Sequence, residues 1–121
     1  MNSSISQNNI IGIFDSGVGG LSVWKELIKL IPGNRMIYVS DNAYSPYGPR
    51  PHTEIIARAV EISEFLIKNG AGIIVVACNT ATAAAIDELR QRFDIPIIGM
   101  EPAVKPAAEM SKTRVIGVLA T

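Results

Sequence analysis

The feature that most constrains the fold of this chain is a regular alternation between short β-branched runs and amphipathic stretches. Apolar runs rich in Ile and Val predict strands at residues 10–14, 36–39, 73–77, 95–99 and 114–120. Helical spacing and capping signals between them predict helices from residue 21 to Pro32, from 53 to 68 with Thr53 as the N-cap, and from 80 to 92. Pro106 limits any helix in the 100–112 region to a short or kinked piece. Such alternation is typical of an α/β fold, predicted here as a doubly wound, largely parallel sheet flanked by helices.

The charge balance of the chain excludes several classes of partner. Eleven basic residues offset eleven acidic ones, so the chain as a whole has no net attraction to nucleic acid or to an anionic membrane.

Residues 1–9 lack the charged head and apolar middle of a secretory signal, and no apolar run approaches the roughly 20 residues of a membrane span. The single cysteine cannot form an intramolecular disulfide. We therefore expect a soluble, cytoplasmic protein that binds neither nucleic acid nor membrane.

Polar and reactive side chains follow every predicted strand. In an open parallel sheet, ligands bind beyond the carboxyl ends of the strands, so these side chains are expected at one rim. Ser, Thr, Asp and Asn are also common at such positions because they cap the next helix, and for any single residue both interpretations stay open. The complete set is harder to explain by capping alone, and it comprises Asp15, Ser16, Asp41, Asn42, Cys78, Asn79, Thr80, Glu101 and Thr121.

Cys78 is the only cysteine, and it lies where an apolar strand passes into a helix. Free cysteine is among the most buried residue types, so a structural role as a small apolar side chain is the simplest interpretation. A thiol just before a helix N-terminus also experiences the positive end of the helix dipole, which favours the thiolate, a base and a nucleophile. His52, the only histidine, comes from a turn-rich loop, and its spacing does not support a Cys-His pair.

The glycine-rich loop after the first strand does not match the common phosphate-binding motifs. Gly17, Gly19 and Ser22 occupy the places of a GxGxxG fingerprint, so its third glycine is missing, and Asp15 would bring a carboxylate close to a pyrophosphate. No GxxxxGK[ST] run occurs either. The glycines are better suited to let backbone N–H groups approach a small anion, such as the carboxylate of a substrate.

Four blocks of the sequence carry a resemblance to a known family, and they are IGIFDSGVGGLSV, YVSDNAYSPYGPRP, VVACNTATAAAIDELR and IPIIGMEPAVKPA. Together they resemble the amino-terminal half of bacterial glutamate racemases, and they follow the family's order through nearly the whole chain after residue 10. The resemblance implies that Cys78 is the first of two catalytic cysteines, with Asp15 available to orient it or to receive its proton. It implies substrate binding at Asp15, Ser16, Tyr47, Gly48, Asn79 and Thr80.

The same resemblance implies a reaction and its setting. The expected reaction interconverts L- and D-glutamate without a metal or other cofactor and supplies D-glutamate for peptidoglycan, and the full-length protein is expected to form a homodimer. Removing an α-proton from one face and returning one to the other needs acid-base groups on opposite sides of the carbon. The family's second cysteine lies in the other half of a longer chain, so these 121 residues, with Cys78 alone, are expected to be inactive by themselves.

An internal repeat agrees with a two-domain organisation. Residues 116–121 (IGVLAT) match residues 11–16 (IGIFDS) in their apolar residues, their glycine and their final hydroxyl residue. Glutamate racemases consist of two pseudo-symmetric α/β domains, so residues 1–99 are expected to be most of the first and residues 100–121 the opening of the second. Thr121 would then be the counterpart of Ser16 and a further substrate-binding residue.

Two other functions stay open at this point. An aspartate racemase or a related amino-acid racemase would share the Cys-Asn-Thr block. A non-catalytic α/β signalling or binding module would suit the length, but a signalling receiver needs an aspartate where this chain has Cys78. If the chain is a racemase, one cleft at the carboxyl rim of the sheet should be lined by Asp15, Ser16, Tyr47, Cys78, Asn79 and Thr80.

Overall fold

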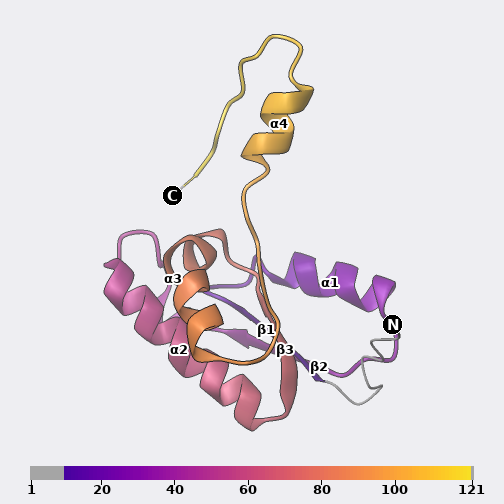
Figure 1. Cartoon of the computed structure of the whole chain (residues 1–121), viewed down its shortest axis with the longest axis vertical. Coiled ribbons are helices and arrows are strands. Elements are labelled where there is room, and N and C mark those ends of the chain that lie inside the picture. Colours follow the sequence, from indigo (N-terminus) through magenta and orange to yellow (C-terminus); the bar gives the residue numbers. More distant parts are fainter. Residues whose placement is uncertain (1–9, 121) are drawn as a thin grey trace.

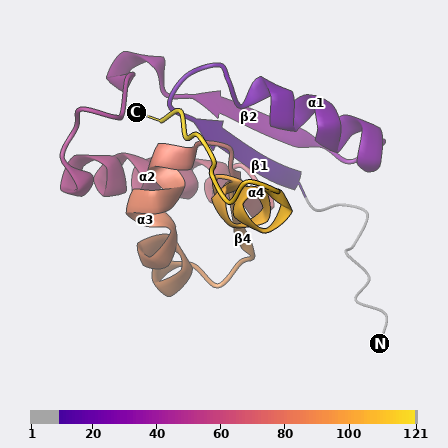
Figure 2. The same cartoon turned by 90° about the horizontal axis from the view of Figure 1, so that it is seen from above.

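The computed structural model describes residues 10–120, and they form one parallel sheet with helices on both faces (Figures 1 and 2). The strands are β1 (Ile10–Asp15), β2 (Met36–Ser40), β3 (Ala71–Val76) and β4 (Ile97–Gly99), in the order β2-β1-β3-β4. Every neighbouring pair is parallel. The predicted α/β fold with a doubly wound parallel sheet is therefore confirmed.

The helices divide between the two faces of the sheet. Helix α1 (Leu21–Leu30) covers one face, whereas α2 (His52–Lys68) and α3 (Asn79–Arg92) cover the other (Figure 2). A short 3-10 turn, η1 (Asn42–Tyr44), follows β2, and α4 (Val104–Met110) follows β4. Helix α2 begins directly after Pro51, so Thr53 lies in its first turn and the predicted N-cap is wrong. No helix among residues 10–120 is long and apolar enough to cross a membrane.

Alternation along β1 explains the two layers of the core. Ile11 and Ile13 face α1, and Phe14 faces α2 and α3, because successive side chains of a strand point to opposite faces. Gly12 lies on the α2 side, where an added Cβ would come within 3.0 Å of Leu66 Cδ1. The absence of a side chain at Gly12 thus lets α2 approach the central strand closely. This tight layer fixes the carboxyl end of β1 against its neighbours.

Helix α1 is covered much less than the other helices of the sheet. None of its residues is buried, and the large apolar side chains on its outer side are partly exposed. The exposed set along this helix and its end comprises Leu21, Trp24, Ile28, Leu30 and Ile31. An apolar stripe of the described chain therefore faces away from its core.

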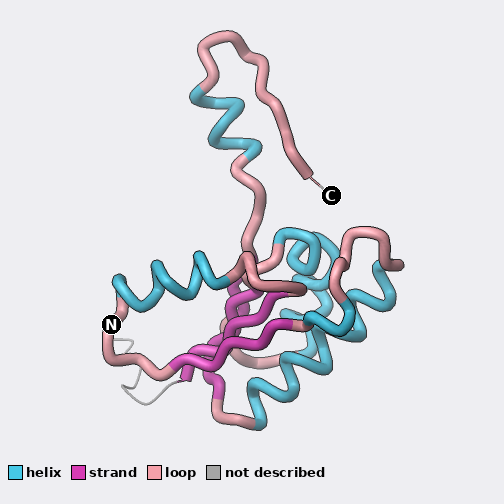
Figure 3. Tube along the Cα trace, turned by 180° about the vertical axis from the view of Figure 1, so that it is seen from behind, coloured by secondary structure: helices cyan, strands magenta, loops and turns pink. Residues whose placement is uncertain are grey.

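The segment after β4 leaves the sheet instead of continuing it. Helix α4 and residues 111–120 project as an arm that turns back toward the sheet (Figures 1 and 3). The predicted strand at 114–120 is wrong, because this segment forms no strand in the structure. A strand is stabilised by a neighbouring strand that pairs with its N–H and C=O groups, and no described strand runs beside these residues. Its apolar pattern alone does not supply that partner.

Candidate active site

The carboxylate of Asp15 organises the glycine-rich loop at the end of β1. Its Oδ1 atom accepts a hydrogen bond from Ser16 N at 2.7 Å, and its Oδ2 atom accepts one from Gly20 N at 2.6 Å. Asp15 is only 6% exposed, so these bonds replace contact of the carboxylate with water. A Cβ at Gly20 would lie 2.9 Å from both Ala77 Cβ and Tyr38 Oη, which leaves room only for glycine. Asp15 thus holds the loop closed over the carboxyl edge of the sheet.

Cys78 caps the N-terminus of α3, as its place in the sequence predicts. Ala81 N donates a hydrogen bond to Cys78 Sγ at 3.4 Å, and the Cys78 thiol donates to Ser16 Oγ at 3.6 Å. Ser16 Oγ in turn donates to Asp15 Oδ1 at 3.4 Å. A chain of polar contacts therefore connects the thiol on β3-α3 with the carboxylate on β1. Cys78 is 8% exposed, so the residue is largely but not completely covered.

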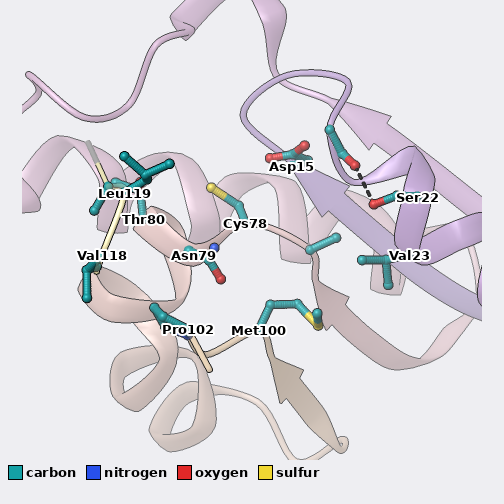
Figure 4. Close-up of a pocket in the computed structure, with 13 residues that line it drawn as sticks. Asp15, Ser22, Val23, Cys78, Asn79, Thr80, Met100, Pro102, Val118 and Leu119 are labelled. Carbon is teal, nitrogen blue, oxygen red and sulfur yellow. Dashed lines mark hydrogen bonds between the residues drawn. The ribbon is translucent and has the colours of Figure 1, made fainter. Parts of the chain in front are cut away.

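These groups lie on one cleft of about 660 Å³ (Figure 4). In the figure, Cys78 and Asn79 lie between Asp15 and the arm residues Val118 and Leu119. Asp15 and Cys78 are the ionisable residues among those that line the cleft in the described part of the chain. The complete lining is Asp15, Gly19, Ser22, Val23, Ala77, Cys78, Asn79, Thr80, Met100, Pro102, Val118, Leu119 and Ala120.

The structure brings together most, but not all, of the predicted site residues. Asp15 and the Cys78–Thr80 run line the cleft, and Ser16 contacts the Cys78 thiol. Neither Ser16 nor Tyr47 is among the lining residues, so the predicted cleft wall is wrong at these two positions. Gly48 lies exposed in the loop after η1, and Thr121 lies outside the described residues. The catalytic and substrate-binding roles of all these residues stay predictions.

One other predicted rim residue, Glu101, lies outside the cleft. Glu101 follows β4 but lines a groove between α3 and α4, together with Arg90 and Lys105. No sequence signal points to the cleft residues Ser22 and Val23 or to the arm residues 118–120, because their place depends on how distant segments pack. Met100 also lines the cleft, and it follows a predicted strand directly, which is the one hint that the sequence offers.

Tyr47 is buried in a charged cluster around Asp41. Its hydroxyl donates to Asp41 Oδ2 at 2.5 Å, and Arg58 donates to the same carboxylate from Nε at 3.0 Å and from Nη2 at 2.8 Å. The Arg58 guanidinium also lies 3.9 Å from the centroid of the Tyr44 ring. This cluster ties the loop that carries Gly48 to helix α2.

The same contacts shift the ionisation of the cluster. Burial, the largest single effect, raises the pKa of Asp41, but hydrogen bonds from Arg58 and Tyr47 and nearby guanidinium charges outweigh it, and this pKa falls below its ordinary value of 3.8. Burial, followed by the bond to Asp41, raises the pKa of Tyr47 well above the ordinary tyrosine value. At neutral pH the cluster therefore consists of an ionised Asp41, a protonated Tyr47 and a charged Arg58.

We expect the substitution Asp41→Asn to lower the free energy of unfolding by about 3 kcal/mol near pH 7, because it removes the buried ion partner of Arg58 and leaves this partly buried guanidinium with the exposed Glu61 alone. In the wild type, the contribution of ionised Asp41 is fully present above its unfolded-state pKa, near 3.8, and is lost as the pH falls through the lower folded-state pKa. The difference between the two proteins should shrink below about pH 4. Urea unfolding from about pH 7 to about pH 3 measures it, and a constant difference over that range contradicts the account.

Within residues 10–120, no cluster of three or more His, Cys, Asp or Glu side chains is arranged to hold a metal ion. The cleft contains a thiol, a carboxylate, and hydroxyl and amide side chains. These groups are suited to proton transfer and to binding a small polar molecule. The expectation that the reaction needs no cofactor stays a prediction.

Comparison with known proteins connects this cleft to one group of enzymes. Residues 11–121 match the family model described as Asp/Glu/Hydantoin racemase. A glutamate racemase from Methylococcus capsulatus is 54% identical over 111 residues, which are 92% of this chain and 41% of that protein. A crystal structure of Escherichia coli glutamate racemase in complex with L-glutamate and the activator UDP-MurNAc-ala aligns with a TM-score of 0.83 and 40% identity, over 88% of this chain and 40% of that one.

A third relative was solved with the other enantiomer. The crystal structure of glutamate racemase from Francisella tularensis in complex with D-glutamate aligns with a TM-score of 0.73 and 38% identity, over 77% of this chain and 36% of that one. In each case the chain spans well under half the length of the relative that it matches.

Proposed function

Because this chain belongs to the Asp/Glu/hydantoin racemase family, we propose that it is the amino-terminal part of a glutamate racemase and that Cys78 exchanges a proton with one face of the α-carbon. The observation that carries the proposal is the Cys78 thiol on the cleft, in contact with Ser16 and linked through it to Asp15. The names of the similar proteins, with their bound L- and D-glutamate, support glutamate as the substrate.

In the proposed step, the thiolate of Cys78 takes the α-proton of glutamate, so that an S–H bond forms as the C–H bond breaks and its electron pair stays on carbon. A helix start suits this task, because the Ala81 N–H group points at the sulfur and the helix dipole favours negative charge there. The negative charge that develops on the substrate carboxylate is stabilised by fixed donors such as Asn79, Thr80 and nearby backbone N–H groups.

Asp15 has a supporting role in the proposal. Its two oxygen atoms are already held by Ser16 N and Gly20 N, so the carboxylate is fixed in direction. Through the Ser16 hydroxyl it fixes the thiol, and the same route allows a proton to pass from Cys78 toward Asp15. Ser16, Asn79 and Thr80 are proposed to bind the substrate, and Tyr47, Gly48 and Thr121 are proposed substrate contacts on the resemblance alone.

Inversion needs a second acid that returns a proton to the opposite face of the carbon. The chain spans 41% of the length of a similar glutamate racemase. We therefore assign the second acid to the part of the full-length protein that corresponds to the unmatched remainder of that relative. On this proposal residues 1–99 are most of the first of two pseudo-symmetric domains, and residues 100–121 open the second. The departure of α4 and the arm from the sheet after β4 supports that division (Figure 1). The proposal has three further parts. The full-length protein supplies D-glutamate for peptidoglycan in the cytoplasm, it forms a homodimer, and it acts without a metal and without binding nucleic acid or membrane.

A direct assay tests the function. The full-length protein that carries these residues should interconvert L- and D-glutamate without added metal or pyridoxal phosphate, and the change in circular dichroism of the amino acid follows the reaction. L- and D-aspartate are the matched alternative substrates, because the family name covers both amino acids. Faster conversion of aspartate than of glutamate would replace the proposed substrate, and conversion of neither would overturn the proposal.

A further inference from the structure

The carbonyl oxygen of Gly17 accepts hydrogen bonds from two hydroxyl groups of β2. Ser40 Oγ donates to it at 2.6 Å, and Tyr38 Oη donates to it at 3.3 Å. Positions 38 and 40 are two residues apart in a strand, so both side chains emerge on the same face of the sheet, the face that α1 covers. Both lone pairs of a single loop carbonyl are thereby occupied by side chains of the neighbouring strand.

This contact lies in the middle of the loop that carries the proposed catalytic groups. Asp15 fixes the two ends of the loop, at Ser16 N and Gly20 N. Between these points the loop contains Gly17 and Gly19, and glycine adds backbone freedom that the Asp15 bonds do not restrain. The position of Ser16, and with it the contact between Ser16 Oγ and Cys78 Sγ, therefore depends on how Gly17 is held.

We propose that Tyr38 and Ser40 are positioning residues that hold the Gly17 carbonyl and thereby set Ser16 and Asp15 against Cys78. The effect on catalysis rests on the proposed racemase function, whereas the hydrogen bonds to the Gly17 carbonyl do not depend on it. Tyr38 also reaches beneath the loop, since its hydroxyl lies 2.9 Å from the place that a Cβ of Gly20 would occupy. Burial, followed by the charges of Asp15 and Cys78, raises the pKa of Tyr38, so its hydroxyl keeps the proton that it donates.

The shared acceptor gives the proposal a distinctive signature. When one hydroxyl is removed, the other still satisfies the Gly17 carbonyl, whereas removal of both leaves a partly buried acceptor without a protein donor. Tyr38→Phe and Ser40→Ala should each lower kcat by about threefold, and the double variant should lower it by at least about thirtyfold, more than the product of the two, because small displacements of catalytic groups are costly. KM should change by a smaller factor than kcat in all of them, since Ser16 is the only proposed substrate contact that is displaced and binding through Asn79 and Thr80 is untouched.

The test uses the full-length protein with two matched controls. Tyr44→Phe removes a hydroxyl from a tyrosine whose ring contacts Arg58 and does not line the cleft. Ser63→Ala removes a buried hydroxyl of α2 that has no hydrogen-bond partner among the described residues. Both controls should keep kcat within about twofold of the wild type. Ser40→Thr retains the hydroxyl and should restore most of the rate that Ser40→Ala loses.

A second measurement separates this inference from the proposed function. The rate at which iodoacetamide alkylates Cys78, followed by peptide mass spectrometry, should rise at least about fivefold in the double variant, because a looser loop uncovers the sulfur. If the wild type does not racemise glutamate but the alkylation rates change as described, the proposed function fails and the positioning role stands. If neither kcat nor alkylation differs between the double variant and the wild type, or if Ser40→Thr behaves like Ser40→Ala, the positioning role is overturned.

Discussion

Replacing Cys78 by Ser in the full-length protein is expected to lower kcat for glutamate racemisation in both directions by at least about a thousandfold. A serine hydroxyl is not ionised near neutral pH, so it does not take the weakly acidic α-proton as a thiolate does. The substitution keeps the shape of the side chain, and serine is a favoured N-cap that still accepts the Ala81 N–H bond. The melting temperature should therefore change little, and circular dichroism of the substrate measures the rate.

A second variant separates chemistry from folding. Cys78→Ala removes the N-cap acceptor as well as the thiol, so it should lose about 1 kcal/mol of stability and the same catalytic activity as Cys78→Ser. Equal losses of rate in two variants of different stability identify the thiol as the essential group. A Cys78→Ser protein that retains a tenth or more of the wild-type rate would show that Cys78 is a structural residue.

The parallel sheet and the position of the thiol were predictable because their causes are local. The near-continuous Ile and Val residues of β3 are typical of a strand covered on both faces, and β3 is such a strand. Cys78 follows that strand directly and precedes a run with helical character, which predicts its place at the start of α3. Because parallel strands end at the same rim, the approach of Asp15 and Cys78 followed from topology without any side-chain detail.

The wrong predictions depend on partners that are distant in the sequence. Residues 114–120 have a strand pattern, but a pattern does not show whether another strand lies beside it, and in the described chain none does. Tyr47 was expected in the wall of the cleft, but it is not among the lining residues, because its hydroxyl donates to Asp41, whose other partner Arg58 comes from the next helix. Nothing near Tyr47 in the sequence indicates that direction. The hydrogen bonds from Tyr38 and Ser40 to the Gly17 carbonyl were equally unpredictable from the sequence, because serine and tyrosine are ordinary residues of a strand.

Residues 1–121 on their own are expected not to racemise glutamate at a measurable rate. Cys78 is the only cysteine of the sequence, and Asp15, the other ionisable residue of the cleft wall, contacts the same group of side chains through Ser16. Neither is placed as a separate acid for the opposite face of the α-carbon, so inversion is not completed. The arm residues Val118 and Leu119 are exposed, so they do not enclose the substrate against water. Conversion of D- to L-glutamate, followed beside the full-length protein, measures the loss.

Folding must be checked before the absence of activity has meaning. The isolated residues should retain helix and sheet signals in far-ultraviolet circular dichroism, because the layer formed by β1, β3, α2 and α3 is complete within them. They should also associate at high concentration, because both α1, with Trp24 and Ile28, and the arm expose apolar side chains to solvent. Light scattering detects the association, and measurements at low concentration keep it from obscuring the assay. If the folded piece converts glutamate and its Cys78→Ser variant does not, a single cysteine serves both faces of the carbon, and the two-base mechanism proposed for the full-length protein is wrong.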